Sequence, residues 1–360
     1  MRIKSVIAII AVVSVILAVS SYFALLETKS DDAKTYQTPL TIVSAKKFQL
    51  YQDDNTTILV DGGNRKIPLN KILSEPADRI IVSSSTHAAF INRLGVVDKI
   101  VGIAGANTHE WYLEKIKLNL EKGLIKDTGL GTNPNYDEII ALSPDIVILS
   151  GGTGMWEEQG KKMDELGIPY IVVSEWLENE PLGQFEWIKV FGLITGTQDK
   201  AWSIFEDASK KAEIITKTVS ESKKPTILWV GVFKGIAHVP RNNSYVGELI
   251  HLVNAEYAFK NLEGTGSAQI SIEDLLVQGK DADILVYSGG FINNTKEIIA
   301  INPLLSELGP IKNCNVYRFQ PWYWESVDRY EDYINDAAAI AHPELFDNYQ
   351  LKQFKKISCV

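Results

Sequence analysis

Cysteine is scarce in this chain, with only Cys314 and Cys359 among 360 residues. The two cysteines form no CxxC pattern and have no metal-ligand spacing, so neither a disulfide-rich scaffold nor a thiolate metal site is encoded. Two free thiols are the expected state, and a bond between Cys314 and Cys359 is the alternative.

Nucleotide-binding and catalytic motifs are missing as well. No GxxxxGK[ST] or GxSxG occurs, and GLGTNP (129–134) lacks the third glycine of a dinucleotide fingerprint. The five histidines lie far apart, without an HxxxH pair, and are better explained as caps or surface residues than as metal ligands. We therefore expect no cofactor, no metal site and no enzymatic activity.

Positive charge is neither abundant nor clustered. The net charge is −9, and the lysines and arginines are scattered along the chain. A protein that binds nucleic acid concentrates its cations to neutralise phosphates, so nucleic acid is excluded as a partner. With 45% hydrophobic and 22% charged residues, the composition suits one large or two medium globular domains.

Charge is absent from the 21 residues Val6–Leu26 near the N-terminus. As a helix this run would be about 31 Å long, enough to cross a bilayer core. Basic residues precede it and acidic residues follow, which places the remainder outside the cytoplasm. Ala18 and Ser20 offer a cleavage site, but the run is long for a signal peptide, so residues 1–26 are interpreted as a retained anchor and 27–45 as a linker.

The rest of the chain alternates between short apolar runs and helix-like stretches. The segment ILVDGGNRKIPL (58–69) predicts a β-hairpin, and the alternation that follows predicts an α/β fold with mostly parallel sheets. Residues 182–222 form a stretch with helical spacing, whose early part is weakened by Gly192 and Gly196, and a second α/β series follows it. The predicted fold is two Rossmann-like lobes (46–181 and 223–350) bridged by one long helix (182–222), with a tail at 351–360.

A sequence segment occurs in two similar copies, NYDEIIALSPDIVILSGGTG (135–154) and SIEDLLVQGKDADILVYSGGFI (271–292). Each copy has an acidic helix start, an apolar helix and a strand that ends in Ser-Gly-Gly, which suggests a duplicated lobe. Ligands of open α/β sheets bind beyond the carboxyl ends of strands, where glycines let the backbone approach a guest. We expect the two glycine edges to face each other across a groove, although simple turn chemistry is the alternative.

Tryptophans and tyrosines gather in predicted loops rather than in predicted helices or strands. Aromatic walls suit flat or apolar chelates, and filling gaps between helices and sheets is the alternative role for any single ring. The rings concerned are Trp111, Tyr112, Trp156, Trp176 and Trp322–Trp324.

Two acidic residues, Asp137 and Glu273, stand at matching points of the two copies. Asn135 and Ser271 are expected to cap these helices, with Glu138 and Asp274 completing the caps. This leaves Asp137 and Glu273 free to meet a cationic partner.

Together these segments resemble the solute-binding proteins of iron-siderophore, haem and cobalamin ABC importers. The resemblance covers residues 56–347 and rests on the order of the hairpin, DRIIVSSS, both repeat copies and DYINDAAAIAHPELF. It implies an extracytoplasmic monomer that captures a metal chelate, most simply an iron-siderophore, between its lobes. The lipid-anchor cysteine usual in this family is missing, so any membrane tether must be residues 6–26.

The resemblance also implies roles for particular residues. Asp137 and Glu273 would dock onto arginines of the membrane permease. The ligand would contact loops after strands, at Ser84, Ser85, Thr86, Thr132, Asn133, Gly152, Thr153, Phe233, Lys234, Gly290, Phe291, Trp322, Tyr323 and Trp324. The loop aromatics Trp111 and Trp156 are expected near the same cleft. Lys234, Arg241 and Arg329 are candidates to offset an anionic chelate, with solvated surface charges as the alternative. An exported enzyme on a chelatase-like two-lobe fold and a tethered sensor module remain alternatives.

Overall fold

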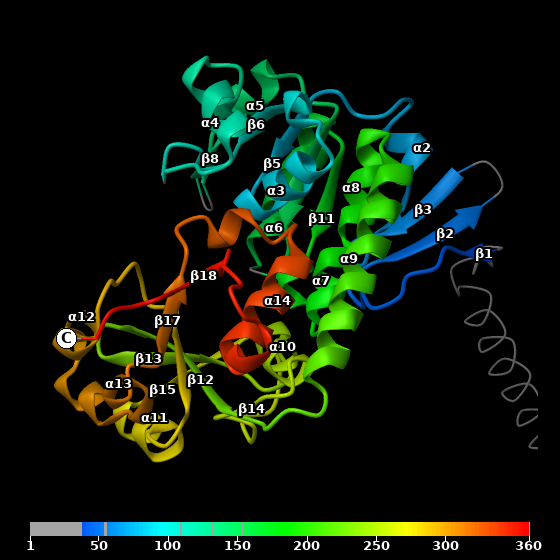
Figure 1. Ribbon diagram of the computed structural model, residues 1–360. Coiled ribbons are helices and arrows are strands. Elements are labelled where there is room, and N and C mark those ends of the chain that lie inside the picture. Colours follow the sequence, from blue (N-terminus) through cyan, green and yellow to red (C-terminus); the bar gives the residue numbers. More distant parts are fainter. Residues whose placement is uncertain (1–37, 54–55, 109, 131–132, 153, 360) are drawn as a thin grey trace, which may run out of the picture.

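The computed structural model describes residues 38–53, 56–108, 110–130, 133–152 and 154–359 (Figure 1). The predicted anchor and most of the linker lie outside the described residues. Among the residues that are described, no helix has both the length and the apolar character to cross a membrane.

An antiparallel sheet opens the described chain, and its strands follow each other in sequence order. The predicted hairpin at 58–69 is confirmed, because β3 pairs with β4. The buried Asp61 carboxylate accepts the N–H groups of Gly63, Arg65 and Val172 and a guanidinium bond from Arg65, which fastens the turn to the neighbouring lobe. The elements are β1 (Thr38–Pro39), β2 (Gln49–Asp53), β3 (Thr56–Val60), β4 (Lys66–Pro68) and α2 (Leu69–Ile72).

The N-terminal lobe is built on a parallel sheet with the order β11-β10-β5-β6-β7. Ile80 and Val82 of β5 pack in one apolar core with α3, while Ile81 packs in another core that includes residues of α5 and α6. Both faces are therefore covered, which explains why these strands are continuous apolar runs. The strands are β5 (Ile80–Val82), β6 (Ile100–Ile103), β7 (Lys126–Asp127), β10 (Ile146–Ser150) and β11 (Tyr170–Val173), and β8 (Gly129–Leu130) and β9 (Asn133–Pro134) form a small separate hairpin.

Helices follow the strands of this lobe in the alternation that the sequence predicts. Ser84 caps the first of them, since its hydroxyl accepts the N–H of Thr86. The helices are α3 (Ser85–Arg93), η1 (Val97–Lys99), α4 (Glu114–Glu121), α5 (Tyr136–Ala141), α6 (Met155–Leu166) and η2 (Glu175–Leu177).

The bridge predicted as one helix over 182–222 is divided into three, namely α7 (Pro181–Glu186), α8 (Ile188–Thr195) and the 22-residue α9 (Gln198–Val219). Gly196 ends α8 in the left-handed conformation (φ 73°), which glycine adopts without a steric penalty. Phe205, Ala208 and Ala212 are buried along one stripe of α9, as their spacing predicts. Figure 1 shows α9 running alongside both lobes, so it connects them as a rigid strut of about 33 Å.

The C-terminal lobe has its own sheet, in the order β15-β13-β12-β16-β17-β18 with β14 also pairing with β12. The two-lobe α/β prediction is thus confirmed. This sheet is mixed, because β12 turns at Lys234 and Gly235 into antiparallel β13 and because the tail adds antiparallel β18. The strands are β12 (Thr226–Phe233), β13 (Ile236–Pro240), β14 (Glu256–Tyr257), β15 (Ser267–Ile270), β16 (Ile284–Tyr287), β17 (Val316–Phe319) and β18 (Phe354–Lys356).

Helices of this lobe include α14, which packs against α9. They are α10 (Tyr245–Leu252), α11 (Ile272–Gly279), α12 (Thr295–Ile301), η3 (Pro303–Glu307), α13 (Gly309–Lys312), η4 (Tyr323–Glu325), α14 (Tyr330–Ala341) and η5 (Pro343–Leu345).

Cys314 and Cys359 form a disulfide, with their Cα atoms 5.4 Å apart. The expectation of two free thiols was therefore wrong. The reason is the path of the tail, which pairs with β17 through β18 and carries Cys359 back to Cys314, just before β17 begins. The predicted tail thus adds a strand, Phe354–Lys356, to the sheet of the C-terminal lobe.

Removing this bond should destabilise the lobe. Replacing both cysteines with serine frees a loop with a sequence separation of 45 residues, and we expect the free energy of unfolding to fall by about 2–4 kcal/mol. Chemical denaturation with and without reductant measures the loss. Reductant should shift the parent protein to the midpoint of the double variant and leave the variant itself unchanged; a parent protein insensitive to reductant would contradict the prediction.

Candidate functional site

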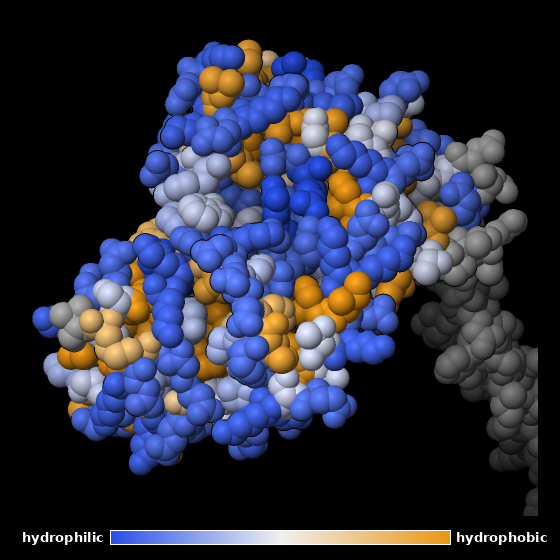
Figure 2. Space-filling view, in the orientation of Figure 1, coloured by the Kyte–Doolittle hydropathy of each residue, from blue (hydrophilic) through white to orange (hydrophobic). Residues whose placement is uncertain are grey.

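A cavity of about 680 Å³ lies between the two lobes. On the face of the molecule shown in Figure 2, hydrophilic residues predominate and apolar residues form smaller patches among them. The N-terminal lobe contributes Ser85, Glu110 and Tyr112, and the C-terminal lobe contributes Ser288, Gly290, Phe291, Phe319, Gln320, Pro321, Tyr323, Trp324 and Glu325. Its volume is in the range of small-molecule sites.

Carboxyl ends of parallel strands supply most of this lining. Ser85 follows β5, Ser288 and Gly290 follow β16, and Phe319 ends β17. Gly290 has a φ of 130°, which side-chain-bearing residues rarely adopt. At Gly289 an added Cβ would lie 2.5 Å from the Tyr287 hydroxyl. Gly290 is thus required by its backbone conformation, and Gly289 by the nearby Tyr287 side chain.

Aromatic rings form the wall on the C-terminal lobe. Phe319 and Tyr323 stack with their ring centroids 3.7 Å apart, and Trp324 stands edge-on to both. Tyr323 is 2% exposed and supports the wall from behind, whereas Trp324 is 53% exposed and Phe291 is 62% exposed. Two large rings therefore remain free to cover the face of a guest.

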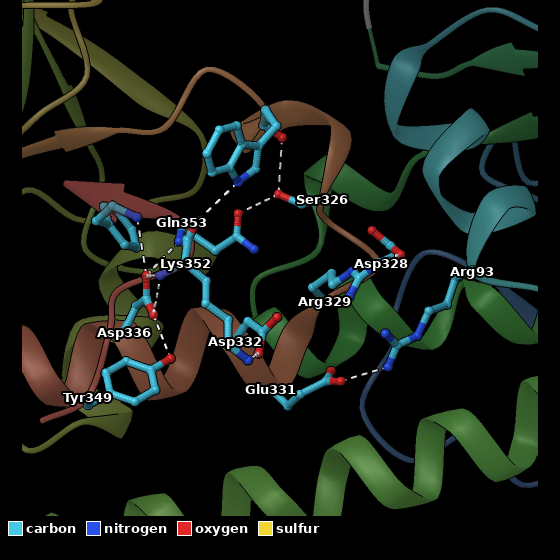
Figure 3. A network of polar contacts seen from close by, with 12 residues as sticks. Arg93, Ser326, Asp328, Arg329, Glu331, Asp332, Asp336, Tyr349, Lys352 and Gln353 are labelled. Atoms are coloured by element: carbon cyan, nitrogen blue, oxygen red, sulfur yellow. Dashed lines mark hydrogen bonds and ion pairs between the residues drawn. The ribbon is translucent and has the colours of Figure 1, made fainter. Parts of the chain in front are cut away.

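Polar contacts tie the lobes together at the edge of the cavity. The Glu325 carboxylate of the C-terminal lobe accepts the N–H groups of Tyr112 and Leu113 at 2.9 Å each. Arg93 on α3 bonds Glu331 on α14 at 2.6 Å (Figure 3). These contacts cross between the lobes and fix the side of the cleft that they border.

Two buried aspartates of the C-terminal lobe lie near these contacts (Figure 3). Asp336 accepts the Tyr349 hydroxyl and the N–H groups of Lys352, Gln353 and Phe354, and burial raises its pKa to about 6. Asp328 is 1% exposed, and neither of its carboxylate oxygens has a hydrogen-bond partner. Burial raises the pKa of Asp328 to about 7, although the nearby cations Arg329 and Arg93 favour the charged form.

A buried pair, His87 and Glu175, lies in the N-terminal lobe with His87 Nε2 3.6 Å from Glu175 Oε2. Burial alone would raise the pKa of Glu175. The interaction with His87 and the hydrogen bond that the Thr86 hydroxyl donates to Glu175 have the larger combined effect, so this pKa is lowered.

The carboxylates with shifted pKa values described above, Glu175, Asp328 and Asp336, are absent from the cavity lining. Among the described residues, moreover, no three His, Cys, Asp or Glu side chains gather as metal ligands would.

Of the ligand contacts expected from the sequence, Ser85, Gly290, Phe291, Tyr323 and Trp324 line the cavity. The other lining residues were missed. The sequence holds a signal for Phe319 and Gln320, because they lie at the end of a predicted strand. It holds one for Glu325 as well, because this residue directly follows the predicted aromatic cluster. Ser288 belongs to the Ser-Gly-Gly ending that was expected at the groove, and Tyr112 is one of the loop aromatics, whereas Glu110 has no comparable signal in the sequence.

Several expected contacts have structural roles in the N-terminal lobe. Trp111 is 5% exposed, and its indole N–H donates to the Ala106 carbonyl. Trp156 lies beside Gly63. The remaining residues are Ser84 and Thr86 at the start of α3, Asn133 in β9, and Thr132 and Thr153, which lie outside the described residues.

Other expected contacts of the C-terminal lobe also lie outside the lining. Phe233 and Lys234 form the tip of the β12–β13 hairpin, and Lys234 lies over the Phe233 ring. Arg241 donates to the Glu263 carbonyl. Trp322 donates to the Lys352 carbonyl, and its ring centroid is 6.1 Å from that of Tyr112.

The Ser-Gly-Gly ending of the first repeat copy packs within the N-terminal lobe instead of lining the interlobe cavity. Gly151 and Gly152 pack against Ser174 and Leu177 of the same lobe. Ser150 borders a different cavity of about 220 Å³ inside the N-terminal lobe. Within the described residues, then, the glycine edge of the second copy alone faces the interlobe cavity, and the expected symmetric pair of edges does not form there.

Asp137 and Glu273 are exposed at the starts of α5 and α11. The predicted caps are present, since Asn135 Oδ1 accepts the N–H of Glu138 and Ser271 Oγ accepts the N–H of Asp274. Neither Asp137 nor Glu273 takes part in any hydrogen bond or ion pair found within the described ranges. Each helix also exposes an aliphatic side chain one turn later, with Ile140 47% and Val277 79% exposed.

Comparison with known proteins relates this geometry to a family. The family model described as periplasmic binding protein matches residues 61–322. An uncharacterized lipoprotein, MJ0878, from Methanocaldococcus jannaschii is 33% identical over 294 residues, which cover 79% of this chain and 70% of the relative.

Solved structures share the fold at low sequence identity. A periplasmic haem-binding protein from Pseudomonas aeruginosa has a TM-score of 0.60 at 18% identity, covering 78% of this chain and 98% of that one. The TroA-like periplasmic binding protein FepB from Veillonella parvula has a TM-score of 0.59 at 18% identity, covering 84% and 99%. The chain therefore belongs to the periplasmic binding protein family, whose members are extracytoplasmic solute-binding components of ABC importers rather than enzymes.

Proposed function

We propose that this protein captures a metal chelate in the interlobe cavity and delivers it to the permease of an ABC importer. An iron-siderophore is the first candidate, and haem or cobalamin are the alternatives. The observation that carries the proposal is the cavity of about 680 Å³ that is walled by the exposed rings of Phe291 and Trp324. Such rings suit the flat or apolar faces of a chelate.

Capture would involve only a modest closure of the lobes. The strut α9 runs beside both lobes, and the contacts of Glu325 and Arg93 already hold them together on one side. The protein would act as a monomer, tethered to the membrane through residues 6–26. Asp137 and Glu273 would meet cations of the permease, and Ile140 and Val277 beside them would add apolar contact.

A fluorescence titration tests the binding step. Ferric siderophores, haem and cobalamin are each added to the full chain, and we expect one of them to quench tryptophan emission saturably. Replacing Trp324 with alanine should weaken that ligand about tenfold or more, because a large contact ring is lost. Trp202→Ala, a change on α9 outside the cavity lining, should leave the affinity unchanged. If no chelate binds, the proposed function is wrong.

A further inference from the structure

We infer that the N-terminal lobe holds a second ligand site, which takes a neutral molecule about the size of one aromatic ring with a hydroxyl group at one end. The site is the cavity of about 220 Å³ inside this lobe. Among the residues that the structure describes, it shares no lining residue with the interlobe cavity. The inference therefore goes beyond chelate capture between the lobes and does not depend on it.

The cavity lies at the carboxyl ends of parallel strands of the N-terminal lobe. Ligands of open α/β sheets bind at this edge of the sheet. Residues of α5 and α6 complete the lining. The strands contribute Ser83 after β5, Ala104 after β6, Thr128 after β7 and Ser150 at the end of β10.

Much of the lining is apolar and buried. A dry cavity of about 150 Å³ with aliphatic walls is already large enough to bind benzene. At about 220 Å³, this cavity has room for a benzene ring with a small substituent at each end. The buried apolar members of the lining include Ile81, Ile139, Val147, Leu149 and Met163.

Charge is absent from the lining as far as the structure describes it. Burial raises the pKa of the Tyr136 phenol, so this lining residue also stays neutral at pH 7. A charged guest would lose its hydration in the cavity without gaining an ion pair from the lining, which is unfavourable. The site therefore selects neutral molecules.

The hydroxyl of Ser83 is the polar group that a guest would meet. Its Oγ atom is buried, and it has no hydrogen-bond partner among the described residues. A buried hydroxyl without a partner is destabilising, and a hydroxyl on the guest would supply the missing bond. Ser83 thus favours a guest with a hydroxyl group over a hydrocarbon of the same shape.

Two methionines on α6, Met155 and Met163, also line the cavity. Thioether side chains adapt their shape and make favourable contacts with aromatic rings, so they favour an aromatic guest. Met1 is the only other methionine in the sequence. The methyl groups of Met155 and Met163 are therefore specific reporters of this cavity.

Three ring compounds of similar shape test the inference. p-Cresol carries a hydroxyl, toluene carries none, and p-toluate carries a charged carboxylate. Each is added to the full chain, labelled with carbon-13 at the methionine methyl groups, and NMR follows the signals, which Met155→Leu and Met163→Leu assign. We expect p-cresol to shift both signals saturably, and p-toluate to bind about tenfold more weakly or less.

Replacing Ser83 with alanine tests the recognition of the hydroxyl group. This variant should bind p-cresol about fivefold more weakly and toluene unchanged, because only the partner of the guest hydroxyl is removed. Ser203→Ala, a change at an exposed position of α9 outside this lining, should alter neither affinity.

Three results would overturn the inference. One is the absence of a saturable shift of the Met155 and Met163 signals with p-cresol and with toluene. Another is p-toluate binding as tightly as p-cresol. The third is a Ser83→Ala variant in which p-cresol loses no affinity relative to toluene. Chelate binding between the lobes is measured by a different titration, so none of these results decides it.

Discussion

Reversing Asp137 and Glu273 together to lysine is expected to abolish delivery of the ligand to the permease and to leave ligand affinity unchanged. Both carboxylates are exposed and unpaired within the described residues, so their replacement breaks no hydrogen bond or ion pair among those residues. If each meets a permease cation, the change turns two attractions into two repulsions. Like charges juxtaposed in an interface cost several kcal/mol, enough to reduce complex formation by orders of magnitude.

Uptake into proteoliposomes that contain the permease measures delivery, and tryptophan fluorescence measures affinity separately. A double reversal on α9, Asp207→Lys with Glu213→Lys, changes the net charge by the same amount at exposed positions away from α5 and α11. This control should transport normally. Lost ligand affinity in the Asp137 and Glu273 variant would mean that these residues serve the ligand site, and normal uptake would mean that they do not dock.

The fold was predictable where the burial of side chains produces a simple pattern of apolar residues in the sequence. Ile80, Ile81 and Val82 form an unbroken apolar run because both faces of the first sheet are covered, and α9 shows its buried stripe at helical spacing. The tail was not predictable in this way. Strand β18 is three residues long and depends on pairing with β17, so neither it nor the Cys314–Cys359 bond leaves a local signal.

The two Ser-Gly-Gly endings show where sequence reasoning about the site stops. Both follow buried strands, and each of the four glycines has either a crowded Cβ position or a positive φ. Gly290 borders the interlobe cavity, whereas Gly151 and Gly152 pack against their own lobe. The same local chemistry serves both arrangements, because which strand end faces the cleft is set by the orientation of the lobes.

Tryptophans illustrate the same limit. Trp111 and Trp324 both occur in predicted loops, yet Trp111 is buried with its N–H bonded to a carbonyl five residues earlier, while Trp324 is half-exposed in the cavity. Only three-dimensional packing separates a ring that fills a gap from one that meets a ligand.

Replacing Asp328 with asparagine is expected to stabilise the protein above pH 7 and to have little effect near pH 4. Burial raises the pKa of Asp328 from an ordinary value of 3.8 to about 7, so the folded protein holds a proton that the unfolded chain releases between these values. The contribution of this carboxyl group to stability is therefore complete below pH 4 and is lost as the pH rises to about 7. At about 1.4 kcal/mol per pH unit, the loss amounts to about 4 kcal/mol, and asparagine, which stays neutral, avoids it.

Urea denaturation of the parent and the variant at several pH values between 4 and 8 measures this difference. The gap in unfolding free energy should open steadily with pH and then level off, because Asp328 is then ionised in both the folded and the unfolded chain. Asp207→Asn on the exposed face of α9 should give no such gap. A variant that is less stable than the parent at pH 8 would show that the attraction of Arg329 and Arg93 exceeds the cost of burying the charge, and that Asp328 fastens the lobe contact as an ion pair.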